Sequence, residues 1–346
     1  MSKRKLNRRQ KWRIEKIQAE KASRADRKEK SITKQKFAGD LSDEQKGLII
    51  AHYGQKLDVE ALEGEEKGKI YRCYVRANID SLVTGDQVIW RAGPDQDGVI
   101  EARLERNSLL QRPDNYGLLK PVAANIDRII IVVATEPTPY ANLIDRYLVA
   151  AETLNIKPAL LFNKSDLIND ENREAIDTLC ESYSSLGYEV LKTSAFELEQ
   201  CESTLLEWLS SYTSIFVGQS GVGKSSLIGS ILGDKSIRIG PLSELSRKGM
   251  HTTTTAKLFH IPGGGEIVDS PGIREFGLWH ITEQELIEGF IELRPFVGYC
   301  RFRDCRHNSE PKCAILSAQE EGKISQTRMD SYRRIRETLG DKETYL

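Results

Sequence analysis

Two patterns of hydrophobic and polar residues divide the body of this chain. Between residues 48 and 110, short stretches rich in β-branched and aromatic residues are separated by Gly, Asp and Pro, as in KIYRCYVRANI, GDQVIWRAG and DGVIEARLER. This pattern predicts a small all-β barrel of about five strands. Barrels of this oligonucleotide-binding (OB) type carry RNA in many proteins, but the same pattern also fits a purely structural barrel.

The second pattern begins at residue 128, where nearly continuous apolar strands alternate with helix-like periodicity. RIIIVVAT at 128–135 is the first strand, and KPALLFNKSD, YEVLKTSA, TSIFVGQSG and EIVDSPG each join a strand to the loop after it. We therefore predict a parallel sheet with helices on both faces, which binds ligands at the carboxyl ends of its strands. Residues 113–124 are expected to form a linker before this sheet, and the tail from residue 288 to be helical.

A phosphate-binding loop is predicted at 218–225, where GQSGVGKS fits the pattern G-x-x-x-x-G-K-[ST] between a strand and a helix. Its glycines let backbone N–H groups turn toward a phosphate, and the following helix points its N-terminus at the anion. Lys224 should reach the outer phosphates, which makes it a candidate catalytic residue, and the Ser225 hydroxyl should bind Mg²⁺. The alternative is a Gly-rich turn without a ligand.

The base is expected to be read by the NKSD stretch at 163–166, which ends an apolar strand. The Asp166 carboxylate can accept two hydrogen bonds from the adjacent N1–H and N2–H₂ groups of guanine, whereas adenine offers no such pair of donors. The Lys164 stem can lie over the base, and Asn163 can tie neighbouring loops together. Backbone groups of Ser194 and Ala195, at the end of the next strand, fit a contact with the guanine carbonyl.

Two further loops complete the predicted site for a nucleoside triphosphate. DSPG at 269–272 follows a predicted strand, so Asp269 should hold Mg²⁺ through water, and the Gly272 N–H should contact the γ-phosphate. One residue of the threonine run at 252–255 is expected to bind Mg²⁺ as well. Thr253 and Thr254 are the best candidates, and their spacing does not choose between them.

The motifs lack the usual water-orienting residue. Many GTPases orient the attacking water with a Gln directly after the D-x-x-G motif, but Ile273 occupies that position here. Slow intrinsic turnover is therefore expected. His251, beside the threonine run, is the candidate that could hold the water, although it could equally pack against the loop.

A metal site is predicted at CRFRDCRHNSEPKC, which gives the spacing Cys300-x4-Cys305-x-His307-x5-Cys313. Three thiolates and one imidazole suit tetrahedral Zn²⁺ with no open coordination position, so we expect one structural zinc ion. Arg301, Arg303 and Arg306 lie among these ligands and could contact phosphate groups or simply be solvated.

The charge distribution separates the N-terminus from the rest of the chain. Residues 1–36 hold 15 Lys and Arg against 4 Asp and Glu, whereas the whole chain has a formal net charge of −1. Such a basic arm, expected to be disordered alone, fits a polyanionic partner such as nucleic acid. No stretch has the ~18–20 apolar residues of a membrane span, and no secretory signal is recognised, so we expect a cytoplasmic protein that binds no membrane.

The order of the motifs is informative, because the guanine-reading stretch precedes the phosphate loop by 55 residues. The motifs occur in the order guanine loop (163–166), guanine loop (194–195), phosphate loop (218–225), threonine run (252–255) and D-x-x-G (269–272). This order resembles that of a circularly permuted GTPase. With the basic arm, SLVTGDQVIW in the barrel, GQSGVGKSS, HTTTT, DSPGIREFGLWH and the Cys/His spacing, the chain resembles the ribosome-small-subunit-dependent GTPase A (RsgA) family.

This resemblance implies a division into a basic arm (1–37), an OB-fold that binds RNA (38–112), a permuted GTPase domain (113–287) and a helical zinc-binding domain (288–346). It also implies a monomer that binds the small ribosomal subunit and its rRNA, uses Mg²⁺ with GTP or GDP, and acts late in subunit maturation. Hydrolysis would be stimulated by the subunit and coupled to release. The implied nucleotide and zinc residues are Asn163, Lys164, Ser165, Asp166, Gly218, Gln219, Ser220, Gly221, Val222, Gly223, Lys224, Ser225, Ser226, Cys300, Cys305, His307 and Cys313.

Two other functions remain open at this point. An RNA-binding assembly factor could use GTP only as a sensory ligand, which Ile273 favours. A P-loop ATPase or kinase is the other alternative, and Asp166 argues against it.

Overall fold

The computed structural model describes residues 41–343 except 54–55, 77–78, 115–116, 196–197, 234–255, 271–277 and 279–280. The described chain divides into two compact units. The first contains residues 41–82 and 86–105, and the second contains residues 83–85 and 106–343. Within these ranges, no helix is both long enough and apolar enough to cross a membrane.

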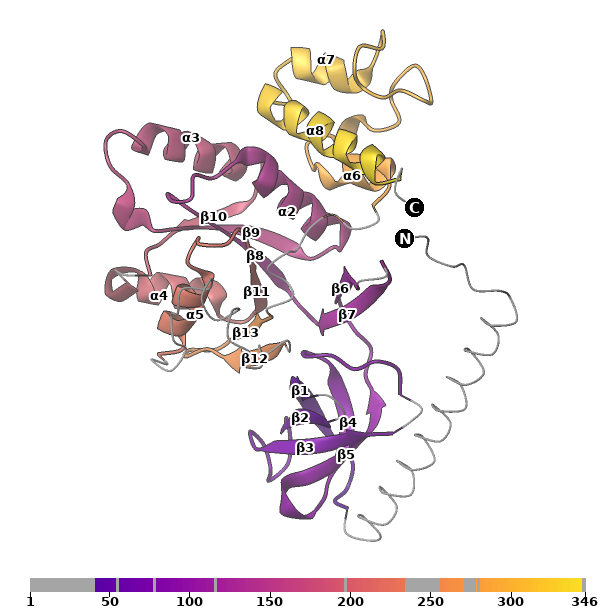
Figure 1. The fold of residues 1–346 in the computed structure, drawn as a ribbon, viewed down its shortest axis with the longest axis vertical. Coiled ribbons are helices and arrows are strands. Elements are labelled where there is room, and N and C mark those ends of the chain that lie inside the picture. Colours follow the sequence, from indigo (N-terminus) through magenta and orange to yellow (C-terminus); the bar gives the residue numbers. More distant parts are fainter. Residues whose placement is uncertain are drawn as a thin grey trace, which may run out of the picture. The chain divides into compact units, whose positions relative to one another are not determined.

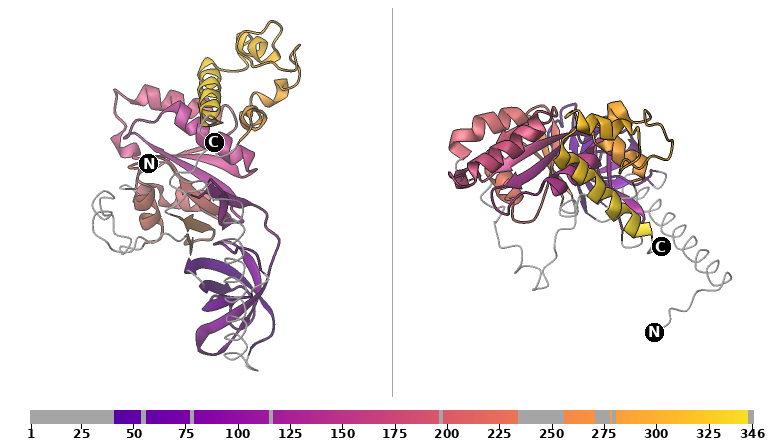
Figure 2. Two further views of the ribbon diagram at one scale, coloured as in Figure 1. Left: turned by 45° about the vertical axis from the view of Figure 1, so that its right-hand side comes forward. Right: turned by 90° about the horizontal axis from the view of Figure 1, so that it is seen from above.

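The first unit is a closed barrel of five strands, as the sequence predicted (Figure 2). The strands follow the order β1-β2-β3-β5-β4, and β1 also pairs with β4, which closes the ring. Alternate residues of β2 are buried, and Trp90 is fully buried in the barrel core. Its elements are β1 (Gln45–Tyr53), β2 (Lys56–Ala61), β3 (Ile70–Val75), β4 (Gln87–Ala92), η1 (Pro94–Gln96) and β5 (Asp97–Arg103).

The second unit is built on a sheet with the strand order β10-β9-β8-β11-β13-β12. The strands from β10 to β13 are parallel, and only β12 runs antiparallel to its neighbour. All seven residues of β8 are buried, which agrees with the uninterrupted apolar run in the sequence. The strands are β8 (Arg128–Ala134), β9 (Lys157–Asn163), β10 (Glu189–Lys192), β11 (Thr213–Val217), β12 (Lys257–His260) and β13 (Glu266–Asp269).

Helices cover both faces of this sheet, as predicted (Figure 1). Leu205 of α4 and Leu227 of α5 belong to one buried cluster with Ile130 and Val132 of β8, so these two helices share a face. Helices α2 and α3 lie on the other face (Figure 1). The elements are α2 (Ala141–Thr153), η2 (Ser165–Leu167), α3 (Arg173–Ser184), α4 (Leu198–Leu209) and α5 (Lys224–Ile231).

The expected linker at 113–124 is wrong in its second half, because these residues belong to a β-hairpin. Strands β6 (Leu109–Pro113) and β7 (Leu119–Ala124) pair in an antiparallel sheet of their own. Pro113 and Pro121 hid this hairpin in the sequence, since proline removes a ladder hydrogen bond and argues against a strand. The register of the hairpin shifts between Leu110 and Gln111, and Gln111 is paired with Pro121.

The C-terminal part of the second unit is helical around the Cys/His segment. Helix α6 begins with a capping box, in which the Thr282 hydroxyl accepts from the Glu285 N–H and the Glu285 carboxylate accepts from the Thr282 N–H. The elements are α6 (Glu283–Gly289), η5 (Arg294–Phe296), α7 (Ala314–Glu320) and α8 (Gln326–Glu343).

Candidate functional site

The predicted nucleotide motifs meet at one edge of the sheet. Asn163 ends β9, Thr193 follows β10, Gly218 follows β11 and Asp269 ends β13. Because β9, β10, β11 and β13 run parallel, their carboxyl ends lie at the same edge, which is where such sheets bind ligands. Positions more than a hundred residues apart in the sequence are thus brought to one place.

The phosphate loop connects β11 to α5 and depends on left-handed backbone geometry. Gly218, Gly221 and Gly223 have φ angles of +137°, +87° and +93°. Lys224 is the first residue of α5, and its Nζ donates to the carbonyls of Gly218 at 2.6 Å and Gln219 at 2.7 Å. These bonds hold the Lys224 ammonium over the loop, where it could contact a bound phosphate.

Asn163 joins the phosphate loop to the second predicted guanine loop, residues 193–195. Its amide donates to the carbonyl of Val222 at 2.8 Å, and its oxygen accepts from the N–H of Ala195 at 3.2 Å. The side chain is 1% exposed, so both bonds are shielded from water. A Cβ on Gly223 would lie 2.3 Å from the Asn163 Nδ2, so this position requires glycine for space as well as for its φ angle.

The two guanine loops are also bonded to each other. The Ser194 hydroxyl donates to Asp166 Oδ1, and the Ser165 N–H donates to the Thr193 carbonyl at 3.1 Å. Asp166 is exposed, whereas Ser194 is fully buried. Ser194 therefore orients the carboxylate that is expected to read the base.

A segment that the sequence analysis missed, residues 135–140, supports the guanine loop from the other side. The Thr135 hydroxyl donates to the Lys164 carbonyl at 3.0 Å, and Lys164 Nζ donates to the Glu136 carbonyl at 2.6 Å. Lys164 itself has a φ of +58°. The signal that could have revealed this segment is its position, since it follows the carboxyl end of β8 in a parallel sheet.

Several predicted residues lie outside the described ranges. These are His251, Thr252, Thr253, Thr254, Thr255, Gly272 and Ile273. Of the expected Mg²⁺ ligands, Ser225 in the first turn of α5 and Asp269 at the end of β13 are described. Strand β13 pairs directly with β11, which carries the phosphate loop, so these two residues follow neighbouring strands.

The four residues of the Cys/His motif converge as the spacing predicted. The ligand atoms of Cys300, Cys305, His307 and Cys313 all lie within 4.8 Å of one another. His307 Nδ1 is 3.3 Å from the Cys313 sulfur and 3.6 Å from the Cys300 sulfur, and the two sulfurs are 3.7 Å apart. Metal–sulfur bonds of about 2.3 Å in a tetrahedron give edges of roughly 3.8 Å. The cluster can therefore hold a tetrahedral metal ion.

The loop that carries these ligands is held by Glu310 and by α8. The Glu310 carboxylate accepts from the backbone N–H groups of Arg306, Asn308 and Ser309, and the bond from Arg306 is the main cause that lowers the pKa of Glu310 to about 2. Arg336 of α8 donates to the Arg306 carbonyl and to Asn308 Oδ1. His307 thus keeps its left-handed φ of +58°.

The chemistry of the donor set also fits a cation. Burial raises the pKa of the Cys305 thiol to about 12, raises that of Cys313, and lowers that of His307. These directions all favour neutral groups. A divalent ion would reverse the balance for the cysteines, because its charge stabilises thiolates, while a neutral imidazole is the form that binds metal.

Comparison with known proteins agrees with this geometry. A family model described as RsgA GTPase matches residues 103–279. A protein of Marinobacter nauticus named "Small ribosomal subunit biogenesis GTPase RsgA" is 59% identical over 344 residues, which cover 99% of this chain and 98% of the relative. A protein of Pseudomonas fluorescens with the same name is 57% identical over 341 residues, which cover 99% of each chain.

Two solved structures are also similar. YloQ, described as a circularly permuted GTPase, is 29% identical, with a TM-score of 0.69 and coverage of 87% of this chain and 96% of that one. YjeQ from Thermotoga maritima is 32% identical, with a TM-score of 0.69 and coverage of 86% and 99%. The predicted circular permutation is confirmed, and the chain belongs to the RsgA GTPase family.

Proposed function

We propose that this RsgA-family GTPase acts in the biogenesis of the small ribosomal subunit. Binding to the subunit in late maturation would stimulate GTP hydrolysis, and hydrolysis would favour release. The observation that carries this proposal is the near-complete coverage by relatives whose name states a role in small-subunit biogenesis. The gathering of both guanine loops and the phosphate loop at one sheet edge supports the nucleotide part.

We assign the nucleotide contacts as follows. Asp166 would accept from guanine N1–H and N2–H₂, with Asn163, Lys164, Ser165, Ser194 and Ala195 shaping the base pocket. The phosphates would lie against residues 218–226, and Lys224 would stabilise charge on the outer phosphates during hydrolysis. Mg²⁺ would be held by Ser225, by Asp269 through water, and by Thr253 or Thr254. His251 would hold the attacking water, and the Gly272 N–H would contact the γ-phosphate.

The remaining parts of the chain are proposed to serve the subunit. The four residues Cys300, Cys305, His307 and Cys313 would bind one structural Zn²⁺. We propose that the chain divides into an arm (1–37), an OB domain (38–112), a GTPase domain (113–287) and a zinc domain (288–346). We also propose a monomer in the cytoplasm, where ribosomal subunits are assembled.

Besides the OB domain (38–112), two parts of the chain are proposed to contact rRNA. In the Cys/His segment, Tyr299 is 78% exposed and Phe302 43%, and the guanidinium of Arg301 lies 5.6 Å from the centre of the Phe302 ring. Aromatic rings stack on unpaired bases, and arginines contact phosphates. The basic arm would add sequence-independent affinity, so deletion of residues 1–36 should weaken binding and flatten its dependence on salt.

A second function is favoured by one residue. Ile273 stands where many GTPases have a water-orienting Gln, so GTP could act mainly as a sensory ligand of an RNA-binding assembly factor. Turnover separates the two functions, because a sensor needs binding without rapid hydrolysis.

The deciding experiment measures GTP hydrolysis with purified small subunits, large subunits or neither, and with ATP as the control nucleotide. We expect strong stimulation by small subunits alone, no ATP turnover, and loss of the stimulated rate in Lys224→Ala. Slow turnover under all three conditions, with tight GTP binding, would favour the sensor. Equal stimulation by both subunits would contradict the proposed partner.

A further inference from the structure

Helix α2 connects the nucleotide-binding sheet to the C-terminal helices. It contacts β8 and β9 of the sheet as well as α6 and α8 (Figure 1). The packing against α6 is close, since a Cβ on Gly289 would lie 2.5 Å from a methyl group of Val149. Arg294 Nη2, in η5, adds an ion pair with Glu152 at 2.6 Å. The C-terminal part of the second unit is thus fixed to α2 at several points.

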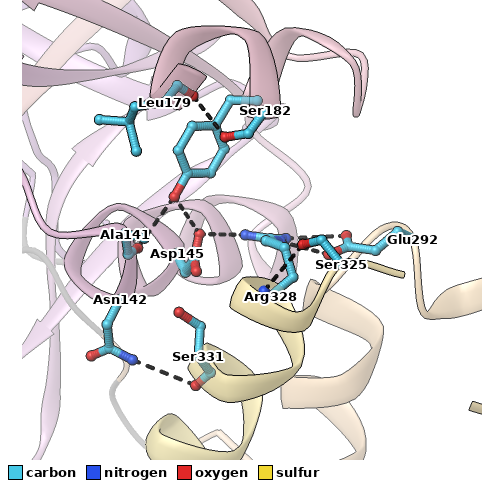
Figure 3. Close-up of polar contacts among 10 residues, drawn as sticks. Ala141, Asn142, Asp145, Leu179, Ser182, Glu292, Ser325, Arg328 and Ser331 are labelled. Carbon is cyan, nitrogen blue, oxygen red and sulfur yellow. Dashed lines mark hydrogen bonds and ion pairs between the residues drawn. The ribbon is translucent and has the colours of Figure 1, made fainter. Parts of the chain in front are cut away.

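A buried charge network lies at the centre of this contact (Figure 3). Arg328 of α8 pairs with Asp145 of α2, and it pairs through Nε and Nη2 with Glu292 at 2.5 and 3.1 Å. The side chains of Arg328, Asp145 and Glu292 are 6%, 0% and 7% exposed. Tyr183 of α3 also donates to Asp145 Oδ1, at 2.7 Å.

The three charges depend on one another. Burial raises the pKa of Asp145, and the charge of Arg328 opposes that rise. Burial alone would lower the pKa of Arg328, but the hydrogen bonds that Arg328 donates to Glu292 and the charge of Asp145 outweigh it and raise the pKa. Losing one partner leaves the others buried and uncompensated, which is far costlier than replacing the whole set with apolar residues.

Contacts continue from this network to the Cys/His cluster. The Arg328 guanidinium lies 4.5 Å from the centre of the Phe290 ring, and Phe290 meets Tyr332 edge-on with ring centres 5.7 Å apart. The Tyr332 ring is in turn 6.4 Å from the ring of His307, one of the four convergent metal-ligating side chains.

The N-terminal end of α2, which also carries Asp145, lies beside the nucleotide loops. A small void of about 10 Å³ separates the start of α2 from the phosphate loop, and it is lined by Tyr140, Ile144, Gln219 and Val222 among others. A Cβ on Gly221 would lie 3.8 Å from Pro137, just before α2. The same segment, residues 135–140, bonds to Lys164 of the guanine loop.

We infer that α2 transmits the position of the C-terminal helices to the nucleotide loops, and that Arg328 is a positioning residue for nucleotide binding. Removal of Arg328 weakens the attachment of α2 to α8 and loosens segment 135–140, which supports both loops. The inference rests on the proposed nucleotide site, and by linkage the bound nucleotide also stabilises α8.

The test compares two buried arginines. Arg328→Met keeps the length of the side chain and removes the charge. Arg128→Met is the matched control, because Arg128 is 2% exposed and pairs with Glu189 at 2.5 Å, but it begins β8 at the edge opposite to the nucleotide loops. The dissociation constant (Kd) of a fluorescent GDP analogue and the melting temperature are measured for both variants and for the unaltered protein.

We expect both variants to melt at lower temperature but only Arg328→Met to bind GDP about fivefold or more weakly, which is the lower range of coupling between sites. Arg328→Lys, which keeps the charge, should recover part of the affinity. Equal losses in the two methionine variants would reduce the effect to stability and overturn the inference, as would an unchanged Kd in Arg328→Met.

A second measurement needs no variant, in case Arg328→Met does not fold. Hydrogen exchange of the full-length protein is compared with and without saturating GDP. We expect slower exchange in α8 when GDP is bound, and unchanged exchange there would overturn the inference. If the unaltered protein does not bind GDP, the proposed nucleotide site fails first, and that result is distinct from binding without coupling to α8.

Discussion

The residues proposed to hold the nucleotide come from positions as far apart as Asn163 and Asp269, whereas the four Cys/His side chains lie within positions 300–313. The first group is held by a sheet whose central strand is buried along its whole length. Of the second group, only Cys313 is buried, and the residues between Val297 and Cys313 contain no helix or strand.

This difference concerns what stabilises each site. Hydrophobic burial in the sheet fixes the edge where the nucleotide loops begin, so we expect that edge to keep its geometry without a ligand. A short loop with few buried apolar residues cannot offset the entropy of ordering in that way. We therefore expect the Cys/His segment to depend on a bound metal for its order, and the nucleotide edge of the sheet to keep its order without one.

Metal removal should have the largest effect. Chelation, or Cys313→Ser, should release residues 297–313 and weaken the contacts of α8, because metal binding supplies the folding free energy of such loops. Hydrogen exchange and the zinc content of the protein measure this. Cys180→Ser is the control, since Cys180 is a buried cysteine of α3 outside the cluster. If β8 and β9 also lose protection from exchange after chelation, the contrast between the two sites is wrong.

Asp166→Asn tests how the base is read. Hydrogen bonds to a charged carboxylate contribute about 1.5–3 kcal/mol to binding. Their loss should therefore weaken GDP binding by roughly tenfold to a hundredfold. Xanthosine diphosphate should gain affinity, because the Asn amide can donate to its carbonyl at C2. Titration with both nucleotides measures the change, and Asp170→Asn, an exposed residue shortly after η2, is the control. An unchanged preference for GDP would remove Asp166 from base reading.

Gly223→Ala separates backbone strain from damage to the site. Alanine at a φ of +93° costs about 1–2 kcal/mol, and its Cβ would also displace Asn163. Gly233→Ala is matched, since Gly233 has a φ of +62° but no atom within 4 Å of the added Cβ. Gly223→Ala should lose more stability than Gly233→Ala in urea unfolding, because the contact with Asn163 adds to the backbone strain, and only Gly223→Ala should lose GDP affinity, by about tenfold or more. Equal affinities would mean that Asn163 does not organise the loops.

Glu310→Gln should have the smallest effect, a rise of about fivefold in the rate of metal dissociation at neutral pH. Because the folded pKa of Glu310 is about 2, below its ordinary value, its contribution is complete above about pH 4.5 and is lost as pH falls toward 2. The ratio of the two dissociation rates should therefore be the same at pH 7 and pH 5. A ratio that already declines at pH 5 would contradict the lowered pKa.

The sequence alone determined the barrel, the alternation of strands and helices, the permuted order of the motifs and the convergence of the Cys/His set. These follow from local patterns: the uninterrupted apolar run of β8, the glycines of the phosphate loop and the spacing of four metal-binding side chains. Where the local signal was ambiguous, as with the prolines of the β6–β7 hairpin, the sequence predicted a linker instead of a strand.

Only the tertiary structure decided which distant polar groups are paired. Asn163 bonds to two loops on either side of it, and segment 135–140 supports the guanine loop. Asp145 and Arg328 are 183 positions apart, and each alone looks like a charged residue on a helix surface. Such pairs leave no periodic or spacing signal, because the packing of whole helices brings them together and the desolvation of each charge makes the other necessary.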